Sequence, residues 1–558
     1  MKEIFTASQE KKVESQAISR WMRMQALAEL PLLVILAVVV CLSAAADIMV
    51  AYVLKMFTDA AAGETTFPLR NIVVIAACVL VGVGITAITS AFLKAKIQGR
   101  IEINIRQQIL TSVLNGEYSQ VQQLHTGDTL TKLTSDAAAV AEYYPRVATD
   151  IVGSALQFLL AVIAIFLLNF KVALLITVVM PLLVLAISLF NTPIGRADER
   201  QKREEEKSRV LIQEYLDLNK LIKLFGVQSR CLANTGCQFE KTYKSKIYFG
   251  IWDGVASFLN SMVGNAILLI TLGGGAYLAI KGETTVGTLI AMTQLFNYIM
   301  KPFSKVAGAV SANAQAKTSA GRIYSILGVP KVDQSAGTAE NIGMISLQNV
   351  WFGYGDEKVL QGIEATFLRG NAYCIVGENG SGKTTLINLI AGLLSPEKGM
   401  VCVKDTKGHD LGRLNGFCTS FVPAEPSLFS DSIRNNITLF DVSVDEDRFT
   451  KAVNMALVDA FASDFPNGYD TLIGQHGSTV SSGQAQRIAI ARAIYWNSDI
   501  MIFDEPTSNL DRTSVDILKE SIRQLKQDKI VIVISHEQSF ESACDVCYHL
   551  EEGKLKQI

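Results

Sequence analysis

The hydrophobic positions of this 558-residue chain follow two different patterns, and the change comes near residue 343. Before it, six apolar stretches approach the ~20 residues that a helix needs to cross a ~30 Å hydrocarbon core. They lie near Leu32–Phe57, Ile72–Leu93, Val147–Leu168, Val172–Phe190, Val255–Ile280 and Val286–Phe303. No such stretch follows Gly343. We therefore predict a membrane domain of six transmembrane helices in residues 31–326, followed by a domain of another kind.

Two of the connections between these spans are themselves predicted to be helical. Segments 94–146 and 191–250 are too long to be structureless in a compact protein. Their apolar residues recur at spacings of three and four, as in IEINIRQQILTSVLN and EEEKSRVLIQEYLDLNKLIKLF. At about 1.5 Å per residue, these helices would extend the spans tens of ångströms beyond the membrane.

The distribution of basic residues predicts the orientation in the membrane. Twelve Lys and Arg residues lie between Arg196 and Lys246, which the positive-inside rule places in the cytoplasm together with both termini. In the N-terminal segment 1–30, residues 16–30 have helical spacing, with Trp21 beside Arg20. This favours an amphipathic elbow helix on the membrane surface, and a continuation of the first span is the alternative. The charge bias fits a bacterial inner membrane, and an organelle membrane is the alternative.

Composition supports a membrane protein and excludes some other classes. Hydrophobic residues make up 49% of the chain and charged residues 19%, against the usual ~25% for charged residues. The net charge of −2 excludes a nucleic-acid-binding protein that relies on bulk basicity. Nine cysteines spread over the whole chain do not form the dense pattern of a disulfide framework.

A few polar residues interrupt the predicted spans, among them Asp47, Asp150 and Gln157. An ionisable group at membrane depth is by default a candidate for function. Each of the two carboxylates also has a simpler explanation. Asp47 could lie near the end of its span, and Asp150 has Arg146 one turn away as a partner.

The pattern after residue 343 predicts an α/β domain in residues 343–558, joined by a linker in residues 327–342. Its short apolar runs are ISLQNVWF, AYCIVG, GFCTSFV, DIMIFDE and IVIVIS. Several are nearly continuous and lie between helical patterns, as expected for parallel strands that are buried on both faces of a sheet.

One of these runs leads directly into a phosphate-binding motif. AYCIVG precedes a G-x-x-x-x-G-K-T sequence and the helical run LINLIAGLL, which is the strand–loop–helix context that this P-loop motif requires. Its backbone amides are expected to surround phosphate oxygens at the N-terminus of a helix. Lys383 would reach the β and γ phosphates, and Thr384 would ligate Mg²⁺. The predicted nucleotide-binding residues here are Gly377, Glu378, Asn379, Gly380, Ser381, Gly382, Lys383, Thr384 and Thr385.

The run DIMIFDE supplies the acidic part of the same site. A buried strand would deliver Asp504 to the metal ion, and Glu505 follows where a base could polarise an attacking water. A nucleotide's phosphates and Mg²⁺ are therefore the expected ligands.

Further motifs resemble those of ATP-binding cassette (ABC) proteins. VSSGQAQRIAIARAIYWNSDIMIFDEPTSNLD, residues 480–511, is similar to that family's stretch from the signature to the D-loop. LHTGDTLTKLTSD and TTVGTLIAMTQLFNYIMKP resemble parts of its membrane domain. Together with six spans and a C-terminal nucleotide-binding domain, these motifs resemble the half-transporters of the exporter type.

The resemblance implies roles for individual residues. Tyr354 matches the aromatic residue that stacks on adenine, and His536 matches the switch histidine that senses the γ phosphate. Ser481, Gly483 and Gln484 match the signature loop, which closes over ATP bound by the opposite chain, while Ser508 and Asp511 match the D-loop. Glu505, His536 and Lys383 are thus the expected catalytic residues.

Two positions depart from the family pattern. Ala424 stands where the lid loop usually has a glutamine that helps to ligate Mg²⁺, and only the neighbouring Glu425 could replace that contact. Ser482 stands in the signature where glycine is usual, and it adds a side chain where backbone approaches phosphate. An altered signature would spoil the partner's site but not this chain's own phosphate loop. We therefore favour a heterodimer with a second half-transporter, and a homodimer is the alternative.

The resemblance implies ATP-driven export across a membrane. Spans of mostly Ala, Val, Leu and Ile favour an amphipathic or apolar cargo, which could be a lipid, a peptide or a drug-like molecule. Membrane lipids and the second half-transporter are the other expected partners. The alternatives are an ATP-binding regulator or channel-like subunit with little hydrolysis, and a purely assembling subunit.

Overall fold

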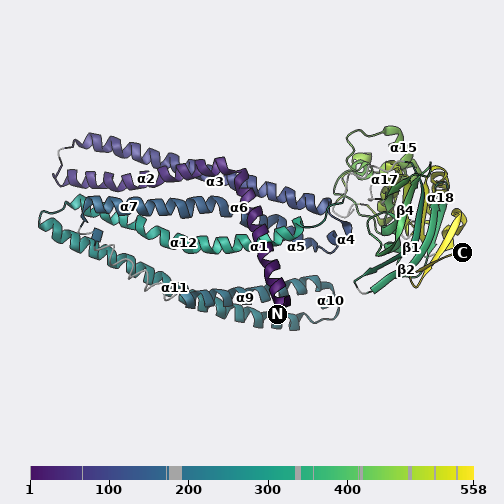
Figure 1. Cartoon of the computed structure of the whole chain (residues 1–558), viewed down its shortest axis with the longest axis horizontal. Coiled ribbons are helices and arrows are strands. Elements are labelled where there is room, and N and C mark those ends of the chain that lie inside the picture. Colours follow the sequence, from purple (N-terminus) through teal and green to yellow (C-terminus); the bar gives the residue numbers. More distant parts are fainter. Residues whose placement is uncertain are drawn as a thin grey trace. The chain divides into compact units, whose positions relative to one another are not determined.

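A computed structural model describes residues 2–65, 67–170, 173–174, 191–332, 341–355, 357–412, 414, 419–474, 480–507, 510–535 and 538–558. The chain forms two compact units (Figure 1). The first unit consists of Met1–Leu110 and Gly127–Leu327, and the second consists of Thr111–Thr126 and Gly328–Ile558.

The first half of the chain is helical. Its α-helices are α1 (Lys2–Ala28), α2 (Leu30–Ala61), α3 (Leu69–Leu114), α4 (Tyr118–Val121), α5 (Thr126–Thr131), α6 (Ala137–Arg146), α7 (Ser154–Leu168), α9 (Asn191–Asp217), α10 (Asn219–Leu224), α11 (Gln228–Ile280) and α12 (Val286–Leu327). Two π-helices, η1 (Lys132–Asp136) and η2 (Val147–Gly153), continue the path from α5 to α7. Helix α1, which contains the predicted elbow segment, ends at Ala28, and α2 begins at Leu30 with Pro31 in its first turn.

Most of the predicted spans are confirmed. Four helical stretches are long and apolar enough to cross a membrane, namely Leu30–Ala61, Leu69–Leu114, Thr126–Leu168 and Gln228–Ile280. The sixth predicted span falls on a shorter apolar stretch at the start of α12, Val286–Ile299. The fourth, Val172–Phe190, lies outside the described residues apart from 173 and 174. The predicted helical extensions are also present, because α3 continues to Leu114 and α9 continues to Asp217.

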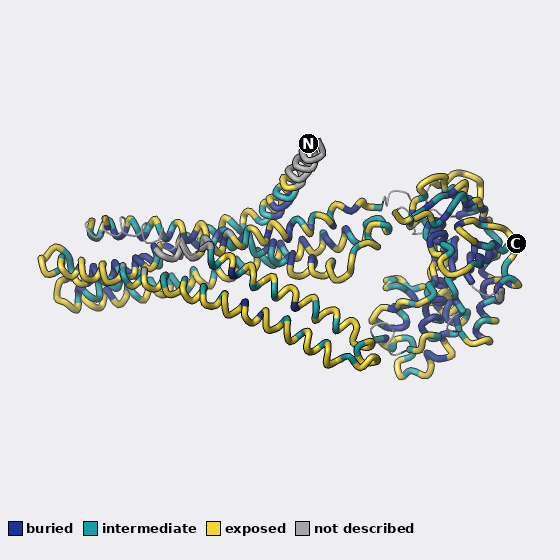
Figure 2. Tube along the Cα trace, turned by 90° about the horizontal axis from the view of Figure 1, so that it is seen from below, coloured by how far each residue is buried: buried dark blue, intermediate teal, exposed yellow. Residues whose placement is uncertain are grey.

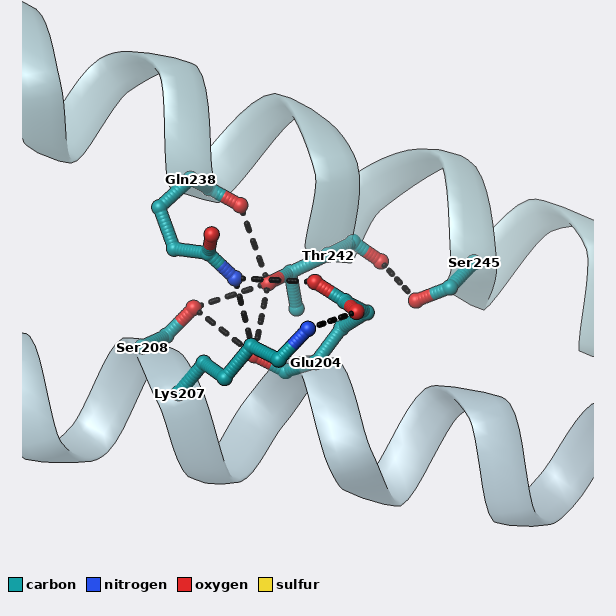
Figure 3. A network of polar contacts seen from close by, with 6 residues as sticks. All are labelled: Glu204, Lys207, Ser208, Gln238, Thr242 and Ser245. Atoms are coloured by element: carbon teal, nitrogen blue, oxygen red, sulfur yellow. Dashed lines mark hydrogen bonds and ion pairs between the residues drawn. The ribbon is translucent and has the colours of Figure 1, made fainter.

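Polar contacts join α9 to α11 in the parts of these helices that are rich in polar residues (Figure 3). The hydroxyls of Ser208 and Thr242 lie 2.8 Å apart, and Gln238 Nε2 donates to Glu204 Oε2 at 3.0 Å. Lys207 Nζ donates to the other Glu204 oxygen at 2.7 Å, and this bond lowers the pKa of Glu204. Ser208 and Thr242 are buried, so their mutual bond satisfies groups that would otherwise be costly to desolvate.

The second unit contains two sheets. Its strands are β1 (Ile342–Tyr354), β2 (Glu357–Leu368), β3 (Ala372–Val376), β4 (Lys398–Asp405), β5 (Asp410–Gly412), β6 (Thr419–Val422), β7 (Ile500–Asp504), β8 (Ile530–Ser535), β9 (Val546–Glu551) and β10 (Lys554–Gln557). An antiparallel sheet has the order β2-β1-β4-β5. The larger sheet has the order β10-β9-β3-β8-β7-β6, and all its strand pairs are parallel except β10 with β9.

Helices accompany both sheets. They are α13 (Lys383–Ile390), α14 (Ile433–Thr438), α15 (Glu446–Met455), α16 (Asp459–Ala462), α17 (Ser482–Trp496) and α18 (Arg512–Leu525), with the 3₁₀ turns η3 (Gly468–Asp470), η5 (Lys526–Asp528) and η6 (Gln538–Ala543). This confirms the predicted class, a helical membrane domain followed by an α/β nucleotide-binding domain.

The parallel strands are buried on both faces, as their sequences predict. Phe503 of β7 packs into a core with residues of α14–α18, whereas its neighbour Ile502 packs into a second core with α13 and the antiparallel sheet. The same alternation separates Cys374 from Ile375 on β3. Successive side chains of a strand point to opposite faces, so both must be apolar when both faces are covered. Figure 2 shows these buried residues gathered in the unit that contains the C-terminus.

Candidate functional site

The predicted phosphate loop and the predicted acidic residues lie at one edge of the parallel sheet. Val376, the last residue of β3, pairs with Ser535 of β8, and Asp504, the last residue of β7, pairs with Ile534 of β8. The carboxyl ends of three adjacent strands therefore coincide, and this is the edge where α/β proteins bind ligands. His536 follows Ser535 directly but lies outside the described residues, as does Ser508.

Glycines give the phosphate loop its shape. A Cβ at Gly377 would lie 2.4 Å from the carbonyl oxygen of Leu550, so a side chain cannot fit between the loop and β9. Gly382 has φ +102°, a left-handed conformation that favours glycine, and α13 begins at the next residue. The loop thus ends where the free N–H groups and the dipole of α13 favour an anion.

Lys383 is the first residue of α13, and its side chain folds back onto this loop. Its side chain is buried, and Nζ donates to the carbonyl oxygens of Gly377 at 2.8 Å and Glu378 at 2.9 Å. Burial lowers the pKa of Lys383, while the charges of Glu505 and Asp504 raise it. The strands therefore bring a cation and two carboxylates together from positions more than 100 residues apart in the sequence.

The residues of the loop fit a magnesium–nucleotide complex. Ser381 Oγ is buried and has no hydrogen-bond partner among the described residues, which leaves its hydroxyl suited to a phosphate oxygen. Thr384 is exposed, and its hydroxyl with the carboxylate of Asp504 supplies the hard oxygen donors that Mg²⁺ prefers. A bound Mg²⁺ would neutralise phosphate charge. The exposed Glu378, Asn379 and Gly380 and the buried Thr385 complete the predicted set.

Glu505 has an unusual backbone. Its φ is +47°, and its N–H donates to the Ile534 carbonyl at 3.0 Å. A left-handed conformation costs a residue other than glycine about 1–2 kcal/mol. Such strain is concentrated at functional sites, and here it sets the direction in which the carboxylate leaves the end of β7.

Tyr354 ends strand β1 and is 49% exposed. Its ring meets Phe352 edge to face, with centroids 5.1 Å apart. It lines a pocket of about 460 Å³ together with Phe352, Gly353, Gly355, Ser119, Gln122 and Gln123. An exposed aromatic ring beside a pocket is free to stack on a base, and the adenine-stacking role of Tyr354 stays a prediction.

The predicted signature residues form the start of α17. Ser481 is its N-cap: Ser481 Oγ accepts from the Gln484 N–H at 3.2 Å, and Gln484 Oε1 accepts from the Ser481 N–H at 2.9 Å. This reciprocal capping box fixes the loop geometry. Ser481 and Ser482 are exposed and Gly483 is partly exposed, so this helix end presents polar groups and backbone on the surface of the unit.

Two residues of α17 that the sequence interpretation missed hold the lid loop around Ala424. Gln486 is fully buried, and its Nε2 donates to the Pro423 carbonyl at 3.3 Å. Arg492 Nη1 donates to the Ser427 carbonyl at 3.2 Å, and burial lowers the pKa of this guanidinium. The available signal was the polar character of Gln486 on the otherwise apolar inner face of α17. Glu425 is exposed beside Ala424.

The predicted D-loop residue Asp511 is joined to the same helix. Arg487 of α17 donates to Asp511 Oδ1 at 3.1 Å and to Ser514 Oγ at 2.6 Å. A hydrogen bond from Ser514 is the main cause that lowers the pKa of Asp511. Lid loop, signature helix and D-loop are therefore connected through side chains of α17.

Comparisons with known proteins agree with this arrangement. Residues 32–303 match the family described as "ABC transporter transmembrane region", and residues 360–508 match the family described as "ABC transporter". The chain is 26% identical over 478 residues to an ATP-dependent lipid A-core flippase of Desulfotalea psychrophila, which covers 85% of this chain and 83% of the flippase.

Two further comparisons concern a longer relative and a protein of known structure. The chain is 25% identical over 539 residues to ABC transporter B family member 1 of Dictyostelium discoideum; the match covers 95% of this chain but spans only 59% of that protein's length. A solved bacterial Atm1-family ABC exporter with ATP bound has the same fold, with a TM-score of 0.77, 21% identity and 95% coverage of both chains.

Proposed function

Because the chain belongs to the ABC transporter family, we propose that it is the half-transporter of an ATP-driven exporter. ATP binding and hydrolysis in residues 343–558 would drive transport through the helices of residues 31–326. The observation that carries this proposal is the meeting of Lys383, Asp504 and Glu505 at one sheet edge, where the charges of both carboxylates act on the Lys383 ammonium. A lysine so placed stabilises phosphate charge, and a carboxylate beside it orients water.

Each residue of the site then has a chemical task. Glu505 accepts hydrogen bonding from the attacking water and orients it toward the γ phosphate. Lys383 moves from its own loop carbonyls to phosphate oxygens and stabilises the negative charge that they carry. Thr384 and Asp504 would hold Mg²⁺, Tyr354 would stack on adenine, and His536 would sense the γ phosphate.

In this proposal the chain works as a dimer with a second half-transporter. Ser481, Gly483 and Gln484 would contact ATP held by the partner's phosphate loop, and Asp511 would lie at the same contact. Support comes from the exposure of the capped end of α17. The serine at position 482 favours a heterodimer, in which the partner supplies an unaltered signature for this chain's own site. A homodimer is the alternative.

The cargo is proposed to be an amphipathic or apolar molecule, carried outward across a bacterial inner membrane. The chain is an integral membrane protein, and we place both termini in the cytoplasm. One relative is named as a lipid A-core flippase. This agrees with an amphipathic cargo but does not distinguish lipid from peptide or drug-like molecules.

ATP turnover by the purified full-length chain in lipid nanodiscs tests the proposal, measured beside the Glu505→Gln variant. Robust turnover that Glu505→Gln reduces at least a hundredfold would support hydrolysis at two self-complementary sites, and hence a homodimer. Binding of ATP without turnover would mean that a partner chain supplies the signature. Turnover that is unchanged in Glu505→Gln would contradict the assignment of this residue.

A second function is favoured by one observation, the alanine in the lid loop. The Ala424 side chain has no atom that can ligate a metal ion, and Glu425 beside it is exposed. A regulator or channel-like subunit that binds ATP and hydrolyses it slowly would tolerate this loss. Slow turnover that no cargo stimulates, together with an ATP-dependent ion conductance, would favour it.

A further inference from the structure

A carboxylate lies on the inner face of the first transmembrane helix. Asp47 is the sole Asp, Glu, Lys or Arg between Glu29 and Lys55. One turn before it and one turn after it, Ala44 and Ala51 are buried at 4% and 0% exposure. The face of α2 that carries Asp47 is thus the face that packs into the helix bundle, and a carboxylate at this depth is expensive and typically functional.

Three helices meet at this carboxylate. Gln157 of α7 is buried, and its Nε2 donates to Asp47 Oδ2 at 2.8 Å. Tyr298 of α12 packs against the apolar cluster that contains Ile48, the residue after Asp47. Asp47 and its neighbours therefore connect segments that are more than 100 residues apart, which places the carboxylate between helices that must move against each other during transport.

The hydrogen bond from Gln157, which is a neutral amide, orients the Asp47 carboxylate. Another carboxylate of the described helices has charged partners. Asp150 of η2 forms ion pairs with two cations, Arg146 at 3.4 Å and Lys305 at 3.7 Å. The ion pair with Arg146 is the one that the sequence predicted for Asp150. Asp150 therefore provides a control for Asp47.

Aromatic side chains from the same three helices pack against the apolar cluster that contains Ile48, next to Asp47. Tyr52 of α2, Phe158 of α7 and Tyr298 of α12 pack against one apolar cluster, which also contains Ala51 and Ala161. Aromatic faces attract organic cations, and the attraction grows when water is excluded. A carboxylate combined with aromatic rings in an apolar setting is complementary to a positively charged group attached to an apolar body.

We propose that Asp47, with Gln157 and Tyr298, forms a recognition site for cationic amphipathic molecules, and that the exported cargo belongs to this class. The inference rests on the proposed export function and narrows its substrate. The alternative is a purely structural role, in which Asp47 and Gln157 only hold α2 against α7, as polar pairs between membrane helices often do. The two readings differ in one respect, because only recognition depends on the sign of a ligand's charge.

Tetraphenylphosphonium and tetraphenylborate test this, since they have nearly the same size and shape but opposite charge. Binding of tritiated tetraphenylphosphonium to the full-length chain in nanodiscs is measured without ATP, with either unlabelled ion as competitor. We expect the unlabelled phosphonium to displace the label at a concentration at least tenfold below that of the borate. Asp47→Asn should weaken binding at least tenfold, while Asp47→Glu and the control Asp150→Asn should change it less than threefold.

Equal displacement by both ions, or unchanged binding to Asp47→Asn, would overturn the proposal. If Asp47→Asn does not fold, the same binding measurement on Gln157→Leu tests the proposal, because this variant keeps the Asp47 charge and removes the amide that orients it. A several-fold loss of binding is expected there, and wild-type binding would overturn the proposal. Since the binding assay needs no hydrolysis, a chain without turnover can still bind the cation. ATP turnover without charge-selective binding would overturn this inference alone.

Discussion

Gln486 donates from Nε2 to the carbonyl oxygen of Pro423 at 3.3 Å, and this bond joins the signature helix to the lid loop across 63 residues of sequence. Arg492, on the same helix, holds the loop at Ser427. In the proposed exporter the signature contacts the partner's ATP, while the lid loop follows the strand next to Asp504. In the proposed dimer, Gln486 would therefore connect the helix end that faces the partner's nucleotide to this chain's own lid loop.

Gln486→Leu should loosen the lid loop more than it destabilises the fold. The substitution removes one hydrogen bond, worth about 1 kcal/mol, but also removes an Oε1 atom that is buried without a partner. We expect faster amide hydrogen exchange in residues 425–429 and an apparent Tm within a few degrees of wild type. Unchanged exchange in this loop would show that Arg492 alone holds it.

Ser381→Ala should separate the stability of the free domain from its affinity for nucleotide. A buried hydroxyl without a hydrogen-bond partner costs about 1–3 kcal/mol, so its removal should stabilise the nucleotide-free protein. The rise in Tm on adding Mg²⁺ and ATP should become smaller, because a phosphate or metal contact is lost. Thermal unfolding with and without Mg²⁺–ATP measures both effects. A lower Tm without nucleotide would mean that Ser381 Oγ serves the fold instead.

Restoring the two usual residues tests whether their loss limits hydrolysis. Ala424→Gln adds an amide that can reach Mg²⁺, and Ser482→Gly removes a side chain from the first turn of α17. In a homodimer both changes act on functional sites, and we expect each to raise turnover a few-fold. In a heterodimer Ser482→Gly should act only on the partner's site, so the chain alone should not gain turnover. Ala424→Ser, with a side chain too short to reach, is the control.

Some parts of the candidate site can be located from the sequence because their determinants are local. The phosphate loop could be located since its glycines, Lys383 and the preceding apolar strand are consecutive. The burial of Ile502 and Phe503 on opposite faces follows from their alternation in one short run. The fold class and most of the spans depend on similarly local patterns.

Contacts between distant segments could not be predicted in the same way. The sequence shows that Gln486 is polar, but its partner is the backbone carbonyl of Pro423 in another loop. Because every residue has a backbone carbonyl, the sequence does not indicate which one Gln486 binds. Asp47 could be recognised as unusual, whereas its contact with Gln157 depends on how α2 and α7 are rotated against each other. The pairing of Asp150 with Arg146 was predicted and is confirmed, because it lies within one turn.

A buried ion pair between η1 and α12 leads to the last prediction, in which the two partners are not equivalent. Asp136 Oδ1 accepts from Ser319 Oγ at 2.8 Å and from Arg322 Nη2 at 2.5 Å. The Asp136 side chain is 3% exposed, whereas the Arg322 side chain is 49% exposed. Removal of the arginine therefore leaves a charge in the interior, while removal of the aspartate leaves a charge that water can reach.

Arg322→Met should accordingly lower stability more than Asp136→Asn. Breaking a buried pair by removing one partner costs about 3–5 kcal/mol, and we reduce this to about 2 kcal/mol because the arginine is half exposed. Asp136→Asn keeps an acceptor for Ser319 and should cost about 1 kcal/mol. The apparent Tm of both variants in nanodiscs measures the order. Equal losses, or a greater loss for Asp136→Asn, would mean that the hydrogen bonds of Asp136 outweigh its charge in joining η1 to α12.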